Sequence, residues 1–210
     1  PVFRVMCDVK GDNPELEKIL LQWHTKMIID ADLCIKLGGH EKYSFLYDIL
    51  PLIADEVYMH THAQSEVLMP PSAVRQLNKL IEENKVILVD ENHLDAKDRA
   101  IYNATYKKLE KVMIHPRKPN KNRGEVCSLS YAKARGIPIF ATDEMDLQPI
   151  IDRLLNTGIN DITCIRIVDI IIRARDGDLC VPRKVAKALW LIAGKKKELF
   201  DTKIWPIEEE

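Results

Sequence analysis

The sequence predicts an α/β fold, a three-layer α/β/α sandwich built on a central, mainly parallel sheet. Short apolar runs alternate with segments of helical periodicity along most of the 210 residues. This is the pattern of parallel strands covered by helices on both faces. The chain is 46% hydrophobic and 30% charged, a composition that suits one α/β domain with a sizeable core.

The first half of the chain supplies strands and helices in turn. Residues 2–9 alternate as a strand, and residues 12–23 predict a helix with Asn13 as its N-cap and Pro14 at its first position. A buried strand over 26–29 ends at Asp30. The elements expected next are a helix over 42–53 interrupted at Pro51, a strand running into a helix over 56–68, a helix over 72–84, a short strand over 85–90 and a long amphipathic helix over 94–113.

The second half follows the same alternation after a loop. Residues 115–124 read as a loop, because two prolines and a glycine forbid regular structure. A helix over 125–136 ends at Gly136, and a buried strand over 137–142 precedes Asp143. A helix over 146–158, a strand over 161–168 and helices over 169–177 and 182–194 complete the pattern before a charged tail.

Three parts are expected along the chain. Residues 1–26 form an accessory strand and helix, residues 27–168 the main domain, and residues 169–210 a helical extension packed on that domain. No apolar run approaches the ~18 residues of a membrane helix, and no signal peptide opens the chain. The five scattered cysteines form no CxxC pair, which argues against a zinc site. These features indicate a reduced, cytoplasmic protein without a membrane role.

Four acids lie at the ends of predicted elements. Asp30 and Asp143 each follow a buried strand, Glu125 begins a helix directly after Gly124, and Glu66 lies on the helix after a strand that contains His60. Each acid alone also suits a helix cap or the helix dipole. Because ligands gather at the carboxyl ends of parallel strands, the four together indicate a site at one edge of the sheet.

Clustered carboxylates repel one another, and a divalent cation removes that conflict. Oxygen-only ligands favour Mg²⁺ or Mn²⁺ over zinc. Such an ion can lower the pKa of a bound water and stabilise a leaving oxygen, which suits the hydrolysis of phosphodiesters. The pair His60 and His62, two apart on an expected strand, reads as ordinary strand residues rather than as metal ligands.

Three stretches carry a resemblance to a known family. "MIIDADLCIKL", "HTHAQSEVL" and above all "RGEVCSLSYAKARGIPIFATDEMDL" resemble the PIN domain, a family of metal-dependent nucleases related to the flap endonucleases. The likeness covers residues 27–168, and residues 124–147 are its most specific part. It implies a PIN-like fold and metal-binding, catalytic acids at Asp30, Glu66, Glu125 and Asp143.

The position of the fourth acid has alternatives. The stretch "ATDEMD" offers Asp143, Glu144 and Asp146. Spacing from Gly136 favours Asp143, whereas the family's DxDL pattern favours Glu144 and Asp146. We rank Asp143 first and include Asp146 as a metal ligand. Asp32, Thr142 and Glu144 are then supporting residues, Asp32 because the resemblance implies a small polar residue at its position.

A basic loop leads into Glu125. Arg117, Lys118, Lys121 and Arg123 lie within residues 115–124 and could make sequence-independent contacts to a nucleic-acid backbone. The alternative is a solvated loop. With a formal net charge of −1, the chain as a whole has no general attraction to nucleic acid, so any binding must come from such a local patch.

Two other functions remain open. "MIIDADLC" also resembles the DxD motif of haloacid-dehalogenase-type phosphatases, in which Asp30 would be the covalent nucleophile and Asp32 the general acid/base. Against this, Cys34 stands where that family usually has Thr or Val, no matching Lys is found, and Glu66 and Glu125 would have no role. The other alternative is a non-catalytic PIN-fold binding module.

The sequence therefore predicts a Mg²⁺- or Mn²⁺-dependent endonuclease, with RNA, single-stranded or structured, as the expected substrate. A homodimer is left open. An antitoxin-like partner is not favoured, because the segments before residue 27 and after residue 168 make the chain longer than the family's compact toxins.

Overall fold

A computed structural model describes residues 26–206 of the chain. The strand and helix expected at 2–9 and 12–23 lie outside the described residues. The described part contains a five-stranded, wholly parallel sheet in the order β3-β2-β1-β4-β5. The strands are β1 (Lys26–Ile29), β2 (Glu56–His60), β3 (Ile87–Val89), β4 (Ile139–Ala141) and β5 (Thr163–Ile165).

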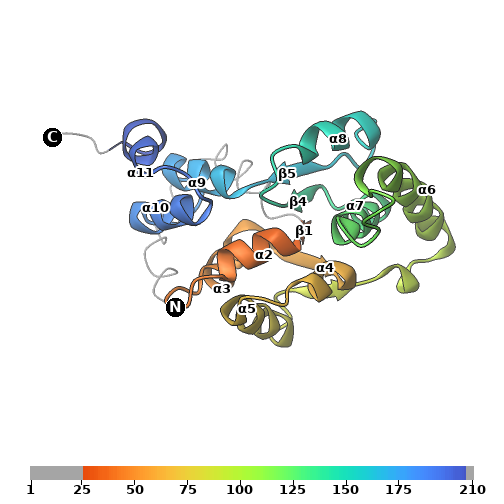
Figure 1. The fold of residues 1–210 in the computed structure, drawn as a ribbon, viewed down its shortest axis with the longest axis horizontal. Helices are drawn as coiled ribbons and strands as arrows, with labels where there is room; N and C mark the ends of the chain where they lie inside the picture. The colour runs from red at the N-terminus through yellow and green to blue at the C-terminus, as the bar shows by residue number, and fades with distance from the viewer. Residues whose placement is uncertain (1–25, 207–210) are drawn as a thin grey trace, which may run out of the picture.

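Both faces of the sheet are covered by helices, as Figure 1 shows. The helices whose apolar side chains join the larger core are α2 (Ala31–Gly38), α3 (Phe45–Ile53), α4 (Thr61–Glu66), α5 (Pro71–Glu82), α9 (Ile167–Asp176) and α10 (Arg183–Ile192). Those of the smaller core are α6 (Ala96–Met113), α7 (Arg123–Arg135) and α8 (Leu147–Leu154). The short turns η2 (Glu91–His93), α11 (Lys197–Leu199) and η3 (Phe200–Ile204) complete the described chain.

Alternation along the central strands separates the two cores. Met27 and Ile29 of β1 belong to the larger core, whereas Ile28 belongs to the smaller one. In β4, Ala141 and Phe140 divide in the same way. Successive side chains of a strand point to opposite faces, so a strand covered on both faces must be apolar throughout. The three-layer α/β/α prediction is confirmed.

Several elements differ in extent from the expectation. A helix, α2, follows Asp30 directly and was not predicted. α3 continues past Pro51, because a proline removes only one intrahelical bond while Leu50 and Ile53 remain buried in the core. α9 begins at Ile167, so a boundary at residue 168 falls inside that helix, and its buried side chains share the larger core with α2 and α3.

The carboxyl ends of the strands lie along one edge of the sheet and start the segments that carry the acids. The Asp30 N–H, just after β1, donates to Ala141 O of β4 at 2.9 Å. The Thr142 N–H, just after β4, donates to Ile165 O of β5 at 3.0 Å. These backbone bonds fix the exits of β1 and β4 side by side. No helix in residues 26–206 is long and apolar enough to span a bilayer.

Candidate functional site

Asp30 lies at the centre of the strand exits and is only 1% exposed. Its Oδ1 accepts from the Ala31 N–H at 2.7 Å and caps α2, and its Oδ2 accepts from Thr142 Oγ1 at 3.4 Å. The pKa of Asp30 is raised to about 7, mainly by burial and also by the charges of Asp32, Glu66 and Glu144, while the Ala31 N–H lowers it. Asp30 is thus both a helix cap and an acid held among other acids.

Glu66 reaches the site from the last turn of α4. Its Oε1 accepts from the Gly124 N–H at 3.0 Å, in the first turn of α7. A Cβ on Gly124 would lie 2.8 Å from that same oxygen, so only glycine leaves room for the carboxylate. Burial raises the pKa of Glu66, whereas the Gly124 N–H and His62 lower it. The glycine before Glu125 therefore positions a second acid.

Glu125 is the least compensated acid of the group. It is 8% exposed, and its Oε2 has no hydrogen-bond partner among the described residues. Burial, and after it the charges of Asp30, Glu144, Glu66 and Asp32, together raise its pKa to about 8. A buried polar atom without a partner is costly, so this oxygen is a candidate ligand atom.

The segment after β4 brings in a fourth acid through Thr142. The buried Thr142 hydroxyl donates to Asp30 and accepts from the Glu144 N–H at 3.3 Å. Glu144 is exposed, and its charge is among those that raise the pKa of both Asp30 and Glu125. Thr142 and Glu144 therefore border the group, Thr142 through its hydrogen bonds and Glu144 through its charge.

Asp143 has other partners. Its Oδ2 accepts from Lys36 Nζ at 2.9 Å, and its Oδ1 accepts from the Ile167 N–H at the start of α9, at 3.3 Å. The main charges on Asp30 and Glu125 come from other acids. Asp143, ranked first as the fourth ligand, is thus paired with Lys36, while the ranking itself stays a prediction. Asp146 is exposed at the N-cap of α8 and makes no capping bond.

Asp32 is the second residue of α2. Its Oδ2 is 2.8 Å from Lys36 Nζ, one helical turn later, and its charge also acts on Asp30 and Glu125. Burial lowers the pKa of Lys36, but the two carboxylate partners outweigh it, so the pKa is raised overall. Sequence reasoning missed Lys36. The signal was an acid and a base four residues apart, which is readable only if a helix after Asp30 is predicted.

The fit of a metal ion was tested on these side chains. As they stand, no three His, Cys, Asp or Glu side chains within residues 26–206 form a group that could hold one metal ion. The donor chemistry fits nonetheless. Asp30, Glu66, Glu125 and Glu144 offer carboxylate oxygens, mutual repulsion raises the pKa values at the centre, and Glu125 Oε2 lacks a partner. A hard divalent cation would satisfy these oxygens, provided that the carboxylates turn toward one another.

His60 contributes to the site indirectly, because it caps α4, the helix that carries Glu66. It ends β2, is fully buried, and its Nδ1 accepts from the His62 N–H at 3.2 Å to cap α4. Its Nε2 lies 3.3 Å from Glu91 Oε2. Burial lowers the pKa of His60 to about 4, with Glu91 opposing, so the ring is neutral at pH 7. His62 lies in α4, so the expectation that both rings share one strand face is wrong.

The basic loop is exposed and adjoins α7. Arg117, Lys118 and Lys121 are exposed in the turns between α6 and α7, where His115 and Lys118 form an isolated bridge. Asn122 has a φ of 62° and its side-chain N–H donates to Met113 O at 3.1 Å. Arg123, also exposed, begins α7 and acts electrostatically on Cys127. The loop therefore presents its cations to solvent, and the last of them, Arg123, lies two residues before Glu125.

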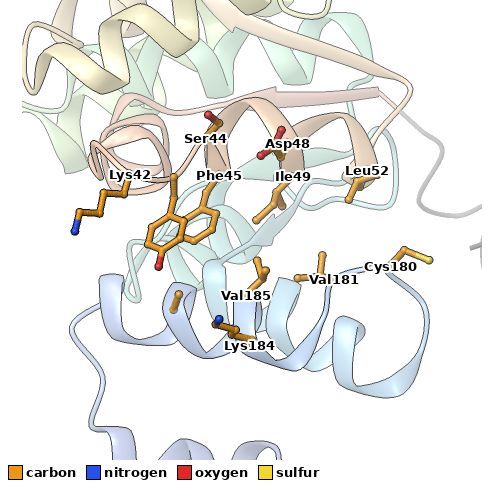
Figure 2. Close-up of a pocket in the computed structure, with 12 residues that line it drawn as sticks. Lys42, Ser44, Phe45, Asp48, Ile49, Leu52, Cys180, Val181, Lys184 and Val185 are labelled. Carbon is orange, nitrogen blue, oxygen red and sulfur yellow. The ribbon is translucent and has the colours of Figure 1, made fainter. Parts of the chain in front are cut away.

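A cavity of about 400 Å³ lies elsewhere, between α3 and α10 (Figure 2). Phe45, Ile49, Val181 and Val185 give it apolar walls. None of the acids at the strand exits lines it. Its position is set by the packing of the C-terminal helices on α3, and we assign it no role in the chemistry of the acids.

Comparison of the chain with models of known protein families, with curated proteins and with solved structures gave no match in any of the three.

Proposed function

We propose that the chain is a Mg²⁺- or Mn²⁺-dependent endonuclease of the PIN type that hydrolyses phosphodiester bonds, with RNA as its expected substrate. One observation carries the proposal. The buried carboxyls of Asp30 and Glu125, from separate segments at the carboxyl edge of a parallel sheet, both feel the charges of Glu66, Glu144 and Asp32, and Glu125 Oε2 has no hydrogen-bond partner among the described residues. Ligand sites of open α/β sheets lie at this edge. The PIN resemblance of residues 27–168 points to the same edge.

The division of work among the residues follows from their surroundings. Asp30 and Glu125 are the most deeply buried acids, so they would hold the ion, while Glu66 is oriented by the Gly124 N–H and Glu144 faces the open side. A bound divalent cation would supply an activated water and charge stabilisation for the leaving oxygen. Because Glu125 Oε2 has no competing partner, it is free to bind the ion or to accept a proton from the water.

The basic loop gives the proposal a means of holding the substrate. Arg117, Lys118 and Lys121 are exposed near the start of α7, and cations on a loop contact phosphates without reading the sequence. Acids that hold a cation and bases that hold the backbone are both needed at such a site. The formal net charge of −1 implies that binding is local to this face and sensitive to salt.

A phosphatase is the second candidate, because Lys36 is a lysine beside Asp32 and Asp143, which that chemistry needs and which sequence reasoning did not find. Two features oppose it. Asp30 is 1% exposed and has Oδ1 engaged as a helix cap, which hinders attack on a phosphate. Glu66 and Glu125 would have no task there. A non-catalytic binding module would likewise leave the unpaired Glu125 oxygen unexplained.

The test is cleavage of a single-stranded RNA in the presence of Mn²⁺ by wild type, Asp30→Asn and Glu125→Gln. We expect wild-type cleavage that stops with EDTA, and a loss of about 100-fold or more in both variants, since each removes a proposed ligand. Glu110→Gln, on the exposed side of α6, is the matched control. Hydrolysis of a small phosphate monoester that Asp30→Asn abolishes and Glu125→Gln leaves intact would support the phosphatase instead.

A further inference from the structure

Lys36 joins two acids at one side of the site. It lies on α2, with Nζ 2.8 Å from Asp32 Oδ2 and 2.9 Å from Asp143 Oδ2. Asp32 comes from the same helix one turn earlier, whereas Asp143 comes from the segment after β4, on the other side of the β1 exit. The Lys36 side chain is 33% exposed and that of Asp143 only 8%. A single ammonium group therefore balances two carboxylates where two strand exits meet.

Asp143 is held at both oxygens. Lys36 binds one of them, and the Ile167 N–H at the start of α9 binds the other. A carboxylate engaged in this way has no need of another cation. It also links β4 to both α2 and α9, so that its place is fixed by the fold.

The other acids have no such partner. Within the described part of the chain, Asp30, Glu66, Glu125 and Glu144 form no salt bridge with Lys, Arg or His. Glu125 is more than nine-tenths buried, and its Oε2 has no hydrogen-bond partner there. The acids thus divide into a pair balanced by Lys36 and a group of four that lacks a counter-charge.

We propose, on the premise of the function given above, that the site takes one divalent cation and that the Lys36 ammonium stands where a second cation would bind. The single ion belongs to Asp30, Glu66, Glu125 and Glu144. Lys36 neutralises Asp32 and Asp143 and excludes a second ion from them by its charge and by its hydrogen bond to Asp143 Oδ2. Lys36 is therefore a positioning residue that sets how many metal ions the site takes.

The test is calorimetric titration of the full chain with Mn²⁺ at pH 8, with no substrate present. We expect wild type to bind one ion. Lys36→Met frees the oxygens of Asp32 and Asp143, so this variant should bind two ions, because adjacent carboxylates without a counter-charge attract a cation. Lys36→Arg keeps the charge and should bind one. Lys97→Met removes an exposed lysine of α6 and should match wild type.

Thermal unfolding gives a second readout. In EDTA, Lys36→Met should unfold at a lower temperature than wild type, because Asp32 and Asp143 repel each other, and Mn²⁺ should restore a larger part of its stability than it adds to wild type. Two bound ions in wild type, or one ion in Lys36→Met, would overturn the role of Lys36 while leaving the metal site intact. No Mn²⁺ bound by wild type would overturn the proposed function itself.

Discussion

Among single residues, the unpaired Oε2 of Glu125 is the feature on which the proposed metal site depends most. A buried carboxyl without a partner destabilises a fold unless it is protonated or bound, and its pKa is raised to about 8 by burial and by neighbouring acids. A chain that needed only a helix start would be better served at this position by an uncharged residue. Under the proposed function, the partner of this acid is a divalent cation.

Replacing Glu125 by Gln should therefore have opposite effects on stability and on binding. In EDTA at pH 9, the variant should be more stable than wild type by about 1–3 kcal/mol, because residue 125 no longer carries a buried charge beside Asp30. Its affinity for Mn²⁺ should be lower by about tenfold or more. Chemical unfolding and calorimetry measure the two effects. A variant that is less stable in EDTA yet binds Mn²⁺ normally would contradict the role given to this oxygen.

The raised pKa values also predict how stability depends on pH. Asp30 and Glu125 titrate at about 7 and about 8 in the folded chain, against ordinary values of 3.8 and 4.5. Between those limits the folded state binds more protons than the unfolded state. The contribution of these two groups to the free energy of unfolding of the metal-free protein should therefore be highest below pH 4. It should fall as the pH rises to 8.

Unfolding in urea from pH 5 to pH 9, with EDTA or with Mn²⁺, measures this dependence. The loss in EDTA should be on the order of several kcal/mol, since one pKa unit corresponds to about 1.4 kcal/mol for each group. Mn²⁺ should add more stability at pH 8 than at pH 5, since its ligands must lose their protons. The same titration of Glu125→Gln, subtracted from that of wild type, gives the pH dependence due to Glu125. If that difference in stability rises with pH in EDTA, Glu125 is not buried beside the other acids.

Single residues also show why sequence reasoning placed some acids and not others. The sequence places Asp30 at a strand end and Glu125 at a helix start, and such positions meet at one edge of a parallel sheet. Glu66 lies in the last turn of α4, and its contact with the Gly124 N–H comes from the packing of α4 against α7, which the sequence does not show. The choice between Asp143 and Glu144 could not be made from the sequence. It depends on Lys36 and on the Ile167 N–H, which take Asp143 and come from segments far away in sequence.

At the scale of elements, the close approach of α4 to α7 brings Glu66 to the site. His60 caps α4 at one end, and the Glu66 carboxylate meets the first turn of α7 at the other. Gly124 permits the contact, since a Cβ there would lie within 3.0 Å of three carboxylate atoms. The glycine thus serves the placement of an acid rather than the packing of a core.

Gly124→Ala should separate stability from metal binding. The Glu66 carboxylate is the far end of a flexible side chain and can move aside, and alanine favours the helix, so stability should change by less than about 1 kcal/mol. Displacement of the carboxylate should weaken Mn²⁺ binding by about tenfold. Calorimetry and urea unfolding check the two expectations.

Gly38→Ala is the matched comparison. A Cβ on Gly38 would lie 2.6 Å from the Cα of Ala73, so α2 and α5 would have to move apart at a cost of about 1–3 kcal/mol. The folded variant should still bind Mn²⁺ as wild type does. If the two glycine variants lose Mn²⁺ affinity equally, Gly124 has no specific relation to Glu66.

The elements themselves were largely predictable where their apolar pattern was long. The helices α5, α6 and α7 and all five described strands match expected segments to within a few residues. The helix α2 was missed because "ADLCIKLG" follows a strand without a break and has acids at its N-cap and at its second residue. Its start is set by the Asp30 cap, so the same residue ends β1 and begins the helix.

For the whole molecule, a near-neutral charge restricts how a nucleic acid can bind. With 31 basic and 32 acidic residues, attraction to a phosphate backbone has to come from one face. Under the proposed function, the exposed cations of the loop before α7 would supply this face. The prolines and the glycine of this loop exclude regular structure, so the sequence predicts an exposed loop. The sequence alone does not show how far its cations lie from the acids.

Replacing Arg117, Lys118, Lys121 and Arg123 with alanine should weaken binding of single-stranded RNA and reduce its dependence on salt. Each lost phosphate contact should reduce the slope of log K against log salt by about 0.7. Fluorescence anisotropy in the Glu125→Gln background measures binding without cleavage. Alanine at Lys184, Lys195, Lys196 and Lys197 removes as much charge from the C-terminal helices. Equal losses of RNA affinity in the two variants would mean that the loop does not bind RNA specifically.

The central claim is that Asp30, Glu66, Glu125 and Glu144 share one metal ion. The most direct measurement is the anomalous scattering of Mn²⁺ in a crystal of the full chain. We predict a single peak bonded to oxygens of Asp30 and Glu125 at about 2.0–2.3 Å, with Glu66 and Glu144 turned toward it and Lys36 still on Asp143. A peak bonded to Asp143 and Asp32 instead, or no peak at this edge of the sheet in a crystal saturated with Mn²⁺, would contradict it.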